Sequence, residues 1–224
     1  MELILKTSWA GVTIKDYMNY KCILEDRNTT DFEKQLDILA LLLSVDRKEM
    51  MSWPANQVTP LFDKMKFLTV KPYSKVEPYY DINGRKFELI MDVNKLTAGQ
   101  FIDLSHYTKD QELVIDNLHL ICSTLLLPIG KYKGKHNPKP DKYDSEKIGD
   151  ISEFLYEHMP ISEALGISNF FTFLFDLFTE ITKLYLEAER TKQLSRASKM
   201  LKQSTMTLVQ QATGSRKSGI GSLR

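Results

Sequence analysis

The chain has 224 residues, of which 42% are hydrophobic and 10% aromatic, and its 30 basic and 29 acidic side chains leave a net charge of +1. This composition is typical of a globular protein and excludes a disordered or collagen-like chain. Polar residues interrupt the apolar runs well before the ~20 residues that a membrane-spanning helix needs, so we expect no membrane segment. Cys22 and Cys122 stand 100 residues apart, which favours two buried free thiols in a reducing cytoplasm.

The basic residues are unevenly distributed. The segment 190–224 holds eight Lys and Arg and no Asp or Glu, whereas residues 1–189 hold 22 basic and 29 acidic side chains, a net charge of −7. The segment is rich in Ser, Thr and Gln and too poor in apolar residues to fold alone. We therefore predict a basic arm over 190–224 that a partner holds.

The first third of the chain predicts helices separated by short breaks. Thr13 is expected to cap a helix that ends near Asp26. Thr30 and Glu33 have the spacing of a capping box, in which each side chain bonds a free backbone N–H of the other residue, and this box opens a second helix.

Two shorter helices are expected next. One covers 47–53 and stops at Pro54. Thr59-Pro60 predicts the start of the other, which runs through Leu68, because proline is favoured at the first position of a helix.

The middle of the chain predicts one β-hairpin near residues 78–90. Asn83-Gly84 suits a type I′ turn, because both residues tolerate the positive φ angles that this turn requires. A two-residue turn places Tyr80 opposite Phe87. Such a ribbon is marginal alone in water, so we expect it to pack against helices.

Three helices are expected after the hairpin. Thr97 begins one that ends at Tyr107, residues 110–127 form one that Pro128 stops, and residues 148–158 form a short one.

The last and longest helix is expected to begin at Ser168. Its apolar residues recur at alternating spacings of four and three, and five Phe lie within 170–178, so nearly its whole circumference is apolar there. A helix that is apolar on most sides is buried on most sides. Either it forms the centre of the chain's own core, or it contributes to an oligomer interface.

Residues 129–145 break the helical pattern, because Gly, Pro and Lys dominate and no apolar period remains. We therefore predict a mainly α protein with one small β-hairpin (class α+β), made of a helical, bundle-like body and a long C-terminal helix that ends in an extended basic arm. The predicted domains are a helical domain over 1–128 with the hairpin near 78–90, a linker loop over 129–145, a helical segment over 146–189 that packs on the body, and the arm over 190–224.

No residue pattern specifies a reaction. Asp116, His119 and Cys122 are spaced by three on one predicted helix, but a metal site needs three or four converging ligands and no second cluster supplies the rest. The alternative is a helix face with a hydrogen-bonded His and a buried thiol. Residues 130–136 lack the spacing and the Ser or Thr of a phosphate-binding loop. We expect no catalytic residue, no metal and no cofactor.

Basic side chains are the candidate binding residues. Lysines and two Tyr crowd the 129–145 loop, a composition that either binds a polyanion through its phosphates or keeps a loop solvated. In the arm, basic residues alternate with apolar ones. That mixture suits an amphipathic element on an acidic protein surface better than on a membrane, because no Trp or Phe would anchor it. The predicted partner- or polyanion-binding residues are Lys131, Lys133, Lys135, Arg190, Lys192, Arg196, Lys199, Lys202, Arg216, Lys217 and Arg224.

Four segments, taken in order, resemble one family of viral proteins. They are VTIKDYMNY, INGRKFELIMDVNKLTAGQFIDLSHY, NLHLICSTLLLPI and MPISEALGISNFFTFLFDLFTE, which together span most of residues 11–187. They are similar to structural-module proteins of tailed bacteriophages that infect Bacteroidetes, including crAss-like phages. The resemblance implies a tail-assembly, neck or tail protein, which in crAss-like phages forms a ring below the portal or travels as cargo inside the particle. It brings no catalytic residues, and the arm lies outside it.

We therefore expect a non-enzymatic structural or packaged (cargo) component of a phage virion, at the portal, neck, tail or particle interior, assembled in the host cytoplasm. Its partners would be other virion proteins (portal, ring, tail or muzzle-type subunits) and further copies of itself, with the arm on neighbouring subunits or DNA. Two alternatives stay open. One is a tail-assembly chaperone that is absent from the finished virion, and the other is a nucleic-acid-binding module that uses the Lys-rich loop and the arm.

Overall fold

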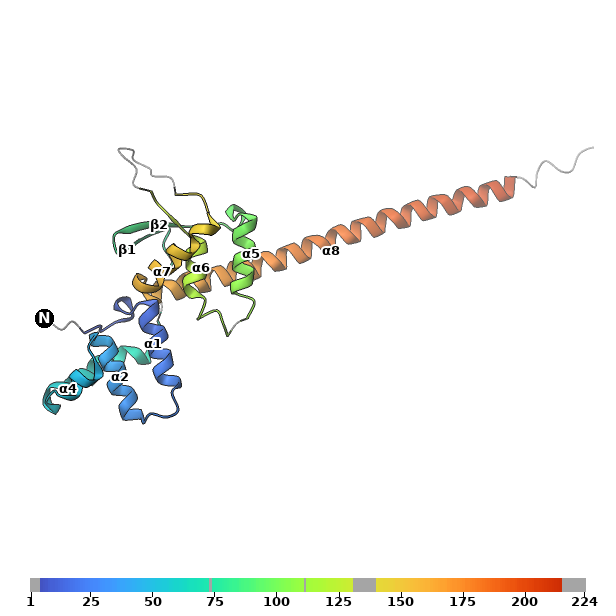
Figure 1. Ribbon diagram of the computed structural model, residues 1–224. Coiled ribbons are helices and arrows are strands. Elements are labelled where there is room, and N and C mark those ends of the chain that lie inside the picture. Colours follow the sequence, from blue (N-terminus) through green and yellow to red (C-terminus); the bar gives the residue numbers. More distant parts are fainter. Residues whose placement is uncertain (1–4, 73, 111, 131–139, 215–224) are drawn as a thin grey trace, which may run out of the picture. The chain divides into compact units, whose positions relative to one another are not determined.

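The computed structural model describes residues 5–72, 74–110, 112–130 and 140–214, and it confirms a mainly helical fold with a small antiparallel sheet (Figure 1). The chain divides into two compact units, Met1–Leu174 and Phe175–Arg224. The first unit is termed the body. The helical part of the second, Phe175 to Gly214, is termed the distal helix.

The body holds the sheet and all helices except the distal part of the last one. The α-helices are α1 (Ile14–Glu25), α2 (Asp31–Leu43), α3 (Arg47–Met51), α4 (Ala55–Lys64), α5 (Ala98–Tyr107), α6 (Leu118–Leu125), α7 (Ile148–His158) and α8 (Ile161–Gly214). The strands are β1 (Tyr79–Ile82), β2 (Arg85–Leu89) and β3 (Leu126–Pro128). Short 3-10 helices cover Trp9–Gly11, Met65–Thr69, Val93–Lys95 and Ser145–Lys147.

Three helices begin at capping boxes, and each begins at a Thr that the sequence predicts as a cap. In each box the Thr hydroxyl accepts from a backbone N–H three residues on, whose own side chain accepts from the Thr backbone. Such caps satisfy N–H groups that the helix leaves free. The pairs are Thr13 with Asp16, Thr30 with Glu33, and Thr97 with Gln100.

The helix predicted to start at Thr59-Pro60 begins earlier, so this prediction is wrong. α4 follows Pro54, whose carbonyl accepts from the Gln57 N–H (2.9 Å), and Pro60 lies inside the helix. The Thr59 hydroxyl donates to the Ala55 carbonyl (2.8 Å) within the helix and caps nothing. Both prolines suit the start of a helix, and the earlier one sets it.

The sheet is antiparallel with the order β1-β2-β3. Asn83 and Gly84 have positive φ angles of 47° and 79°, and Tyr80 lies opposite Phe87, which confirms the predicted turn and register. The sequence did not predict β3, which pairs with β2 and extends the predicted two-stranded ribbon to a three-stranded sheet. A third strand supplies the support that a lone hairpin lacks.

The prediction of one helix over 110–127 is wrong at both ends of that range. α6 begins only at Leu118, because the preceding residues form turns. In these turns the Asp110 carboxylate accepts from the Glu112 N–H, and the Asn117 amide donates to the Tyr107 carbonyl. At the other end Leu126–Pro128 pairs with β2. A short apolar run fits a buried strand as well as a helix, and its pairing partner decides between them.

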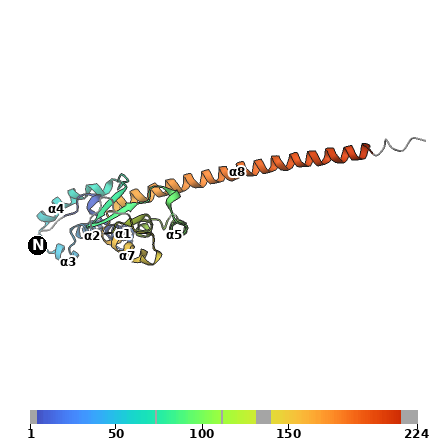
Figure 2. The ribbon, with the colours of Figure 1, turned by 90° about the horizontal axis from the view of Figure 1, so that it is seen from above.

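The two ends of the body's chain meet at a backbone junction. The Ile14 N–H donates to the Met159 carbonyl (3.0 Å), and the Ile161 N–H donates to the Val12 carbonyl (2.8 Å). All four side chains are at most 2% exposed. Next to this junction α1 lies beside α7 (Figures 1 and 2). The junction therefore ties the first helices to the last ones in a shared core.

α8 begins at Ile161 and not at the predicted Ser168. The Pro160 carbonyl accepts from the N–H groups of Glu163 and Ala164 (3.1 Å each), which sets the start of the helix. Ser168 lies inside α8 and is buried. The sequence does not reveal this start, because the junction that holds Pro160 forms only in the folded chain.

Candidate functional site

The candidate binding residues that the structure describes lie on the distal helix, and the predicted arm is therefore helical as far as Gly214. Four of them are exposed, and a fifth belongs to the same helix. They are Arg190, Lys192, Arg196 and Lys199, with Lys202 as the fifth. The other six, Lys131, Lys133, Lys135, Arg216, Lys217 and Arg224, lie outside the described residues.

Large apolar side chains are exposed along the distal helix. Leu184, Tyr185 and Leu186 are 62%, 64% and 60% exposed. Successive residues of an α-helix point about 100° apart, so these three lie on different sides of it. Leu194 and Met200 are exposed as well. Exposed apolar side chains on several sides of one helix make it a candidate interaction site.

The Phe-rich start of this stretch belongs only partly to the core. Phe171 is 3% exposed, whereas Phe173 is 66% exposed. Of the side chains that the structure describes from Phe175 to Gln203, none is buried. The prediction that this helix lies at the centre of the chain's own core is therefore correct for Phe171 and wrong for Phe173, Leu184 and Tyr185. The interface alternative stays a prediction.

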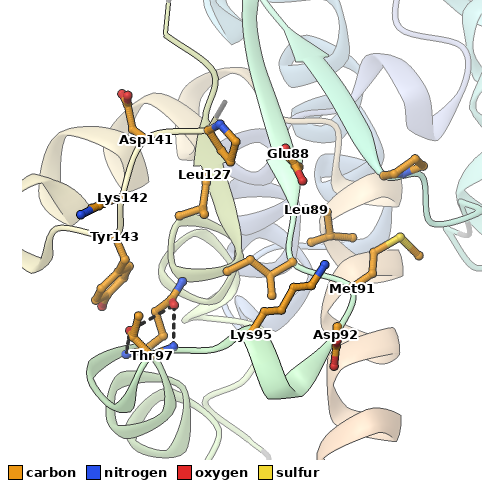
Figure 3. Close-up of a pocket in the computed structure, with 14 residues that line it drawn as sticks. Glu88, Leu89, Met91, Asp92, Lys95, Thr97, Leu127, Asp141, Lys142 and Tyr143 are labelled. Atoms are coloured by element: carbon orange, nitrogen blue, oxygen red, sulfur yellow. Dashed lines mark hydrogen bonds between the residues drawn. The ribbon is translucent and has the colours of Figure 1, made fainter. Parts of the chain in front are cut away.

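A pocket of about 670 Å³ lies in the body beside the end of β2 (Figure 3). Leu89 and Met91 lie on one side of it and Tyr143 on the other (Figure 3). The Asp141 N–H donates to the Pro128 carbonyl (2.8 Å), which fixes the Tyr143 side next to β3. The charged lining residues are Glu88, Asp92, Lys95, Asp141 and Lys142.

Hydrogen bonds hold the wall of this pocket in place. The Gln100 side chain, 1% exposed, accepts from the Thr97 backbone N–H (3.0 Å) and donates to the Thr124 carbonyl (2.8 Å). The Tyr143 hydroxyl donates to the Asp103 carboxylate. Burial is the larger cause and this hydrogen bond the smaller one of a rise in the pKa of Tyr143 well above its usual value. The hydroxyl therefore stays a donor at neutral pH.

The chemistry of the pocket suits binding. Among its described lining residues there is no His, Cys or Ser, and the Thr97 hydroxyl is engaged with Gln100. Sequence reasoning did not find the pocket, because its walls come from residues 78–100, Leu127 and residues 140–143.

The three residues considered for a metal site have other neighbours. Asp116 accepts from the Lys21 amine (2.9 Å), and the His119 ring meets the Tyr156 ring edge-on at 5.4 Å. Cys122 is fully buried, and burial raises the pKa of its thiol. Within the described ranges no three His, Cys, Asp or Glu side chains could hold a metal ion together.

Both cysteines are free thiols, and their burial differs. Cys122 is buried, as predicted, but Cys22 is exposed on α1, so the prediction of two buried thiols is wrong for Cys22.

Comparisons with known proteins give no match. No family model, no curated protein and no solved structure matches the chain. The phage resemblance therefore stays a prediction from the four sequence segments. In the part of the chain that the structure describes, no helix is both long enough and apolar enough to cross a membrane.

Proposed function

We propose that the chain is a non-enzymatic, multi-copy structural or packaged component of a tailed-phage virion. The observation that supports this proposal most is the exposure of Leu184, Tyr185 and Leu186 on different sides of the distal helix. One neighbouring helix covers only one side of another, so burying all three requires more than one neighbour. A particle in which each copy touches several subunits meets this requirement.

The body supports the proposal because its own core is complete without such neighbours. Leu39, Phe87, Leu118 and Leu155 are at most 1% exposed and come from different parts of the body. A folded body with an exposed apolar helix has the organisation of a subunit that is tethered in a larger assembly.

The position in the particle rests on the resemblance of residues 11–187, which favours the portal, neck, tail or interior. The basic residues from Arg190 onward would then face neighbouring subunits or DNA. DNA presents phosphates, and residues 1–189 of a further copy carry a net charge of −7, so lysine and arginine can neutralise either.

Quantitative mass spectrometry of purified virions tests the proposal. We expect the full-length chain in several copies per particle, with the major capsid protein as the internal standard for copy number. Absence from virions contradicts the proposal. If the chain is absent from virions but bound to a tail protein in infected cells, it is an assembly chaperone.

A further inference from the structure

Charge on the distal helix changes sign at one point along its length. From Phe175 to Glu189 there are four acidic residues and one basic residue, a net charge of −3. From Arg190 to Gly214 there are five basic residues and no acidic one, a net charge of +5. The acidic residues are Asp176, Glu180, Glu187 and Glu189, and the one basic residue among them is Lys183.

These charges lie on the surface. Asp176, Glu180 and Glu187 are exposed, as are Arg196 and Lys199 beyond the change of sign. The Lys192 amine bonds the Glu189 carboxylate (2.8 Å) across the boundary. The five exposed charges named above are therefore placed to act on a neighbour.

The direction of pairing between two copies follows from this division. Two distal helices side by side, parallel and in register, place acidic residues against acidic ones and basic against basic. An antiparallel pair places the acidic half of each helix against the basic half of the other. Opposite charges at contact distance attract and like charges repel, so charge favours the antiparallel pair.

We propose that the distal helix pairs antiparallel with the distal helix of a second copy, centred near Glu189 and Arg190. The inference rests on the multi-copy packing proposed above and adds the segment and its direction. With this centre, Leu184 lies next to Leu194 of the second copy, and both side chains are more than 60% exposed. Along the helix axis, Glu180 then lies level with residues 198–199 of the second copy, and so next to Lys199.

Other occupants match only one half of the helix. DNA or an acidic protein attracts the basic half but meets the net charge of −3 on the acidic half. With the pair centred near Glu189 and Arg190, residues 175–204 of each helix lie opposite each other, and over this stretch a second copy complements both halves. Each helix presents the same surface to the other in this pair, and the remaining sides of the helix stay available to further subunits.

Cysteine cross-linking of the full-length chain tests the direction. In a Cys22→Ser background, one chain carries Leu184→Cys and another carries Leu194→Cys, while Cys122 stays buried. In the antiparallel pair, identical positions lie ten residues apart along the helix, about 15 Å. A disulfide needs Cα atoms within about 7 Å. We therefore expect little cross-linking of either variant alone and efficient cross-linking of the mixture after exchange under reducing conditions.

Two results would overturn the antiparallel pair. Efficient cross-linking of each variant with itself indicates a parallel pair. No cross-linking in any sample, while native mass spectrometry still shows an oligomer, places the interface elsewhere and leaves the multi-copy proposal intact. Failure of the multi-copy proposal appears separately, as absence of the chain from virions.

Charge reversal gives an independent readout. The variant Glu180→Lys with Glu187→Lys makes the distal helix mainly basic, and Arg196→Glu with Lys199→Glu makes it mainly acidic. We expect the dissociation constant of each variant with itself to rise, by about tenfold or more for the basic variant, and the equimolar mixture to associate more tightly than either variant alone. Unchanged self-association of both variants would contradict the proposed pairing.

Discussion

The two parts of α8 differ in burial, although both carry large apolar side chains. In the first part, Ile161, Ala164 and Ile167 are completely buried in the body. In the distal helix, Leu184 and Leu194 are 62% and 67% exposed. The apolar residues of a helix therefore predict that it is buried in the functional protein. The elements around the helix decide whether that burial occurs within the same chain.

Gly166 shows how closely the first part is packed. A Cβ atom at this position would lie 2.8 Å from the Ser74 carbonyl oxygen, so only glycine allows the backbone at Ser74 to lie against α8. The first part is thus adapted to a neighbour within the chain. We expect the same adaptation in the distal helix toward neighbours in other copies.

The largest expected effect separates the two parts of α8 directly. Ile167→Ala should lower the free energy of unfolding of the body by about 2–5 kcal/mol, because it leaves a cavity in a closed core. Leu184→Ala, the matched control, should change it by less than about 0.5 kcal/mol. Urea unfolding at low protein concentration measures both, and equal losses would remove the distinction between the two parts.

The second expected effect uses two glycines in helices. Gly166→Ala should destabilise the body by about 1–3 kcal/mol, because the new methyl group meets the Ser74 backbone. Gly149→Ala in α7 has nothing within 4 Å of the added Cβ. It should therefore be neutral or stabilising by up to about 1 kcal/mol, as expected from helix propensity. A stabilising Gly166→Ala would show that α8 does not pack closely at Ser74.

A third, smaller effect tests where helices of the body start. Thr30→Ala should cost about 1 kcal/mol, because it removes the hydroxyl that caps α2. Thr59→Ala, inside α4, should cost less than about 0.5 kcal/mol, because its hydroxyl only bonds a carbonyl of its own helix. Chemical denaturation compares the two, and a larger loss at Thr59 would restore the helix start predicted there.

The smallest effect concerns pH. Burial raises the pKa of Glu163, in the first part of α8, above its ordinary value. The folded body therefore favours protonated Glu163. The stability that Glu163 contributes is fully present below the pKa of the unfolded chain and is lost as the pH rises through the higher pKa of the folded chain. Glu163→Gln should remove this loss, so the variant gains stability relative to the wild type as the pH rises above about 4.5, the ordinary pKa of the carboxyl.

Unfolding midpoints at a series of pH values compare Glu163→Gln with the wild type. Parallel pH profiles for the wild type and Glu163→Gln would show that Glu163 is not desolvated by the fold.

Features set by neighbouring residues in sequence could be predicted, and those set by distant contacts could not. Thr13, Thr30 and Thr97 cap helices through residues three positions away, and Asn83-Gly84 makes its turn alone. Local chemistry decides such features.

Distant contacts account for what the sequence did not reveal. β3 exists because Leu126 lies opposite Leu89, and α8 starts where Pro160 pairs with Thr13. The pocket joins three separate segments of the chain. The sequence shows the change of charge between Glu189 and Arg190 as the border of the basic arm. Only the structure places both charged segments on one helix, and this placement is what suggests the antiparallel direction of pairing.

The mass of the full-length chain in solution tests the central claim, that exposed apolar residues of the distal helix hold copies together. Sedimentation equilibrium compares the wild type with the double variant Leu184→Lys and Leu194→Lys, while urea unfolding confirms that the body is unchanged. We predict that the wild type has the mass of at least two copies at micromolar concentration and that the double variant has the 25.9 kDa mass of one chain. A wild-type chain that stays at 25.9 kDa, or a double variant that keeps the wild-type mass, would contradict the account.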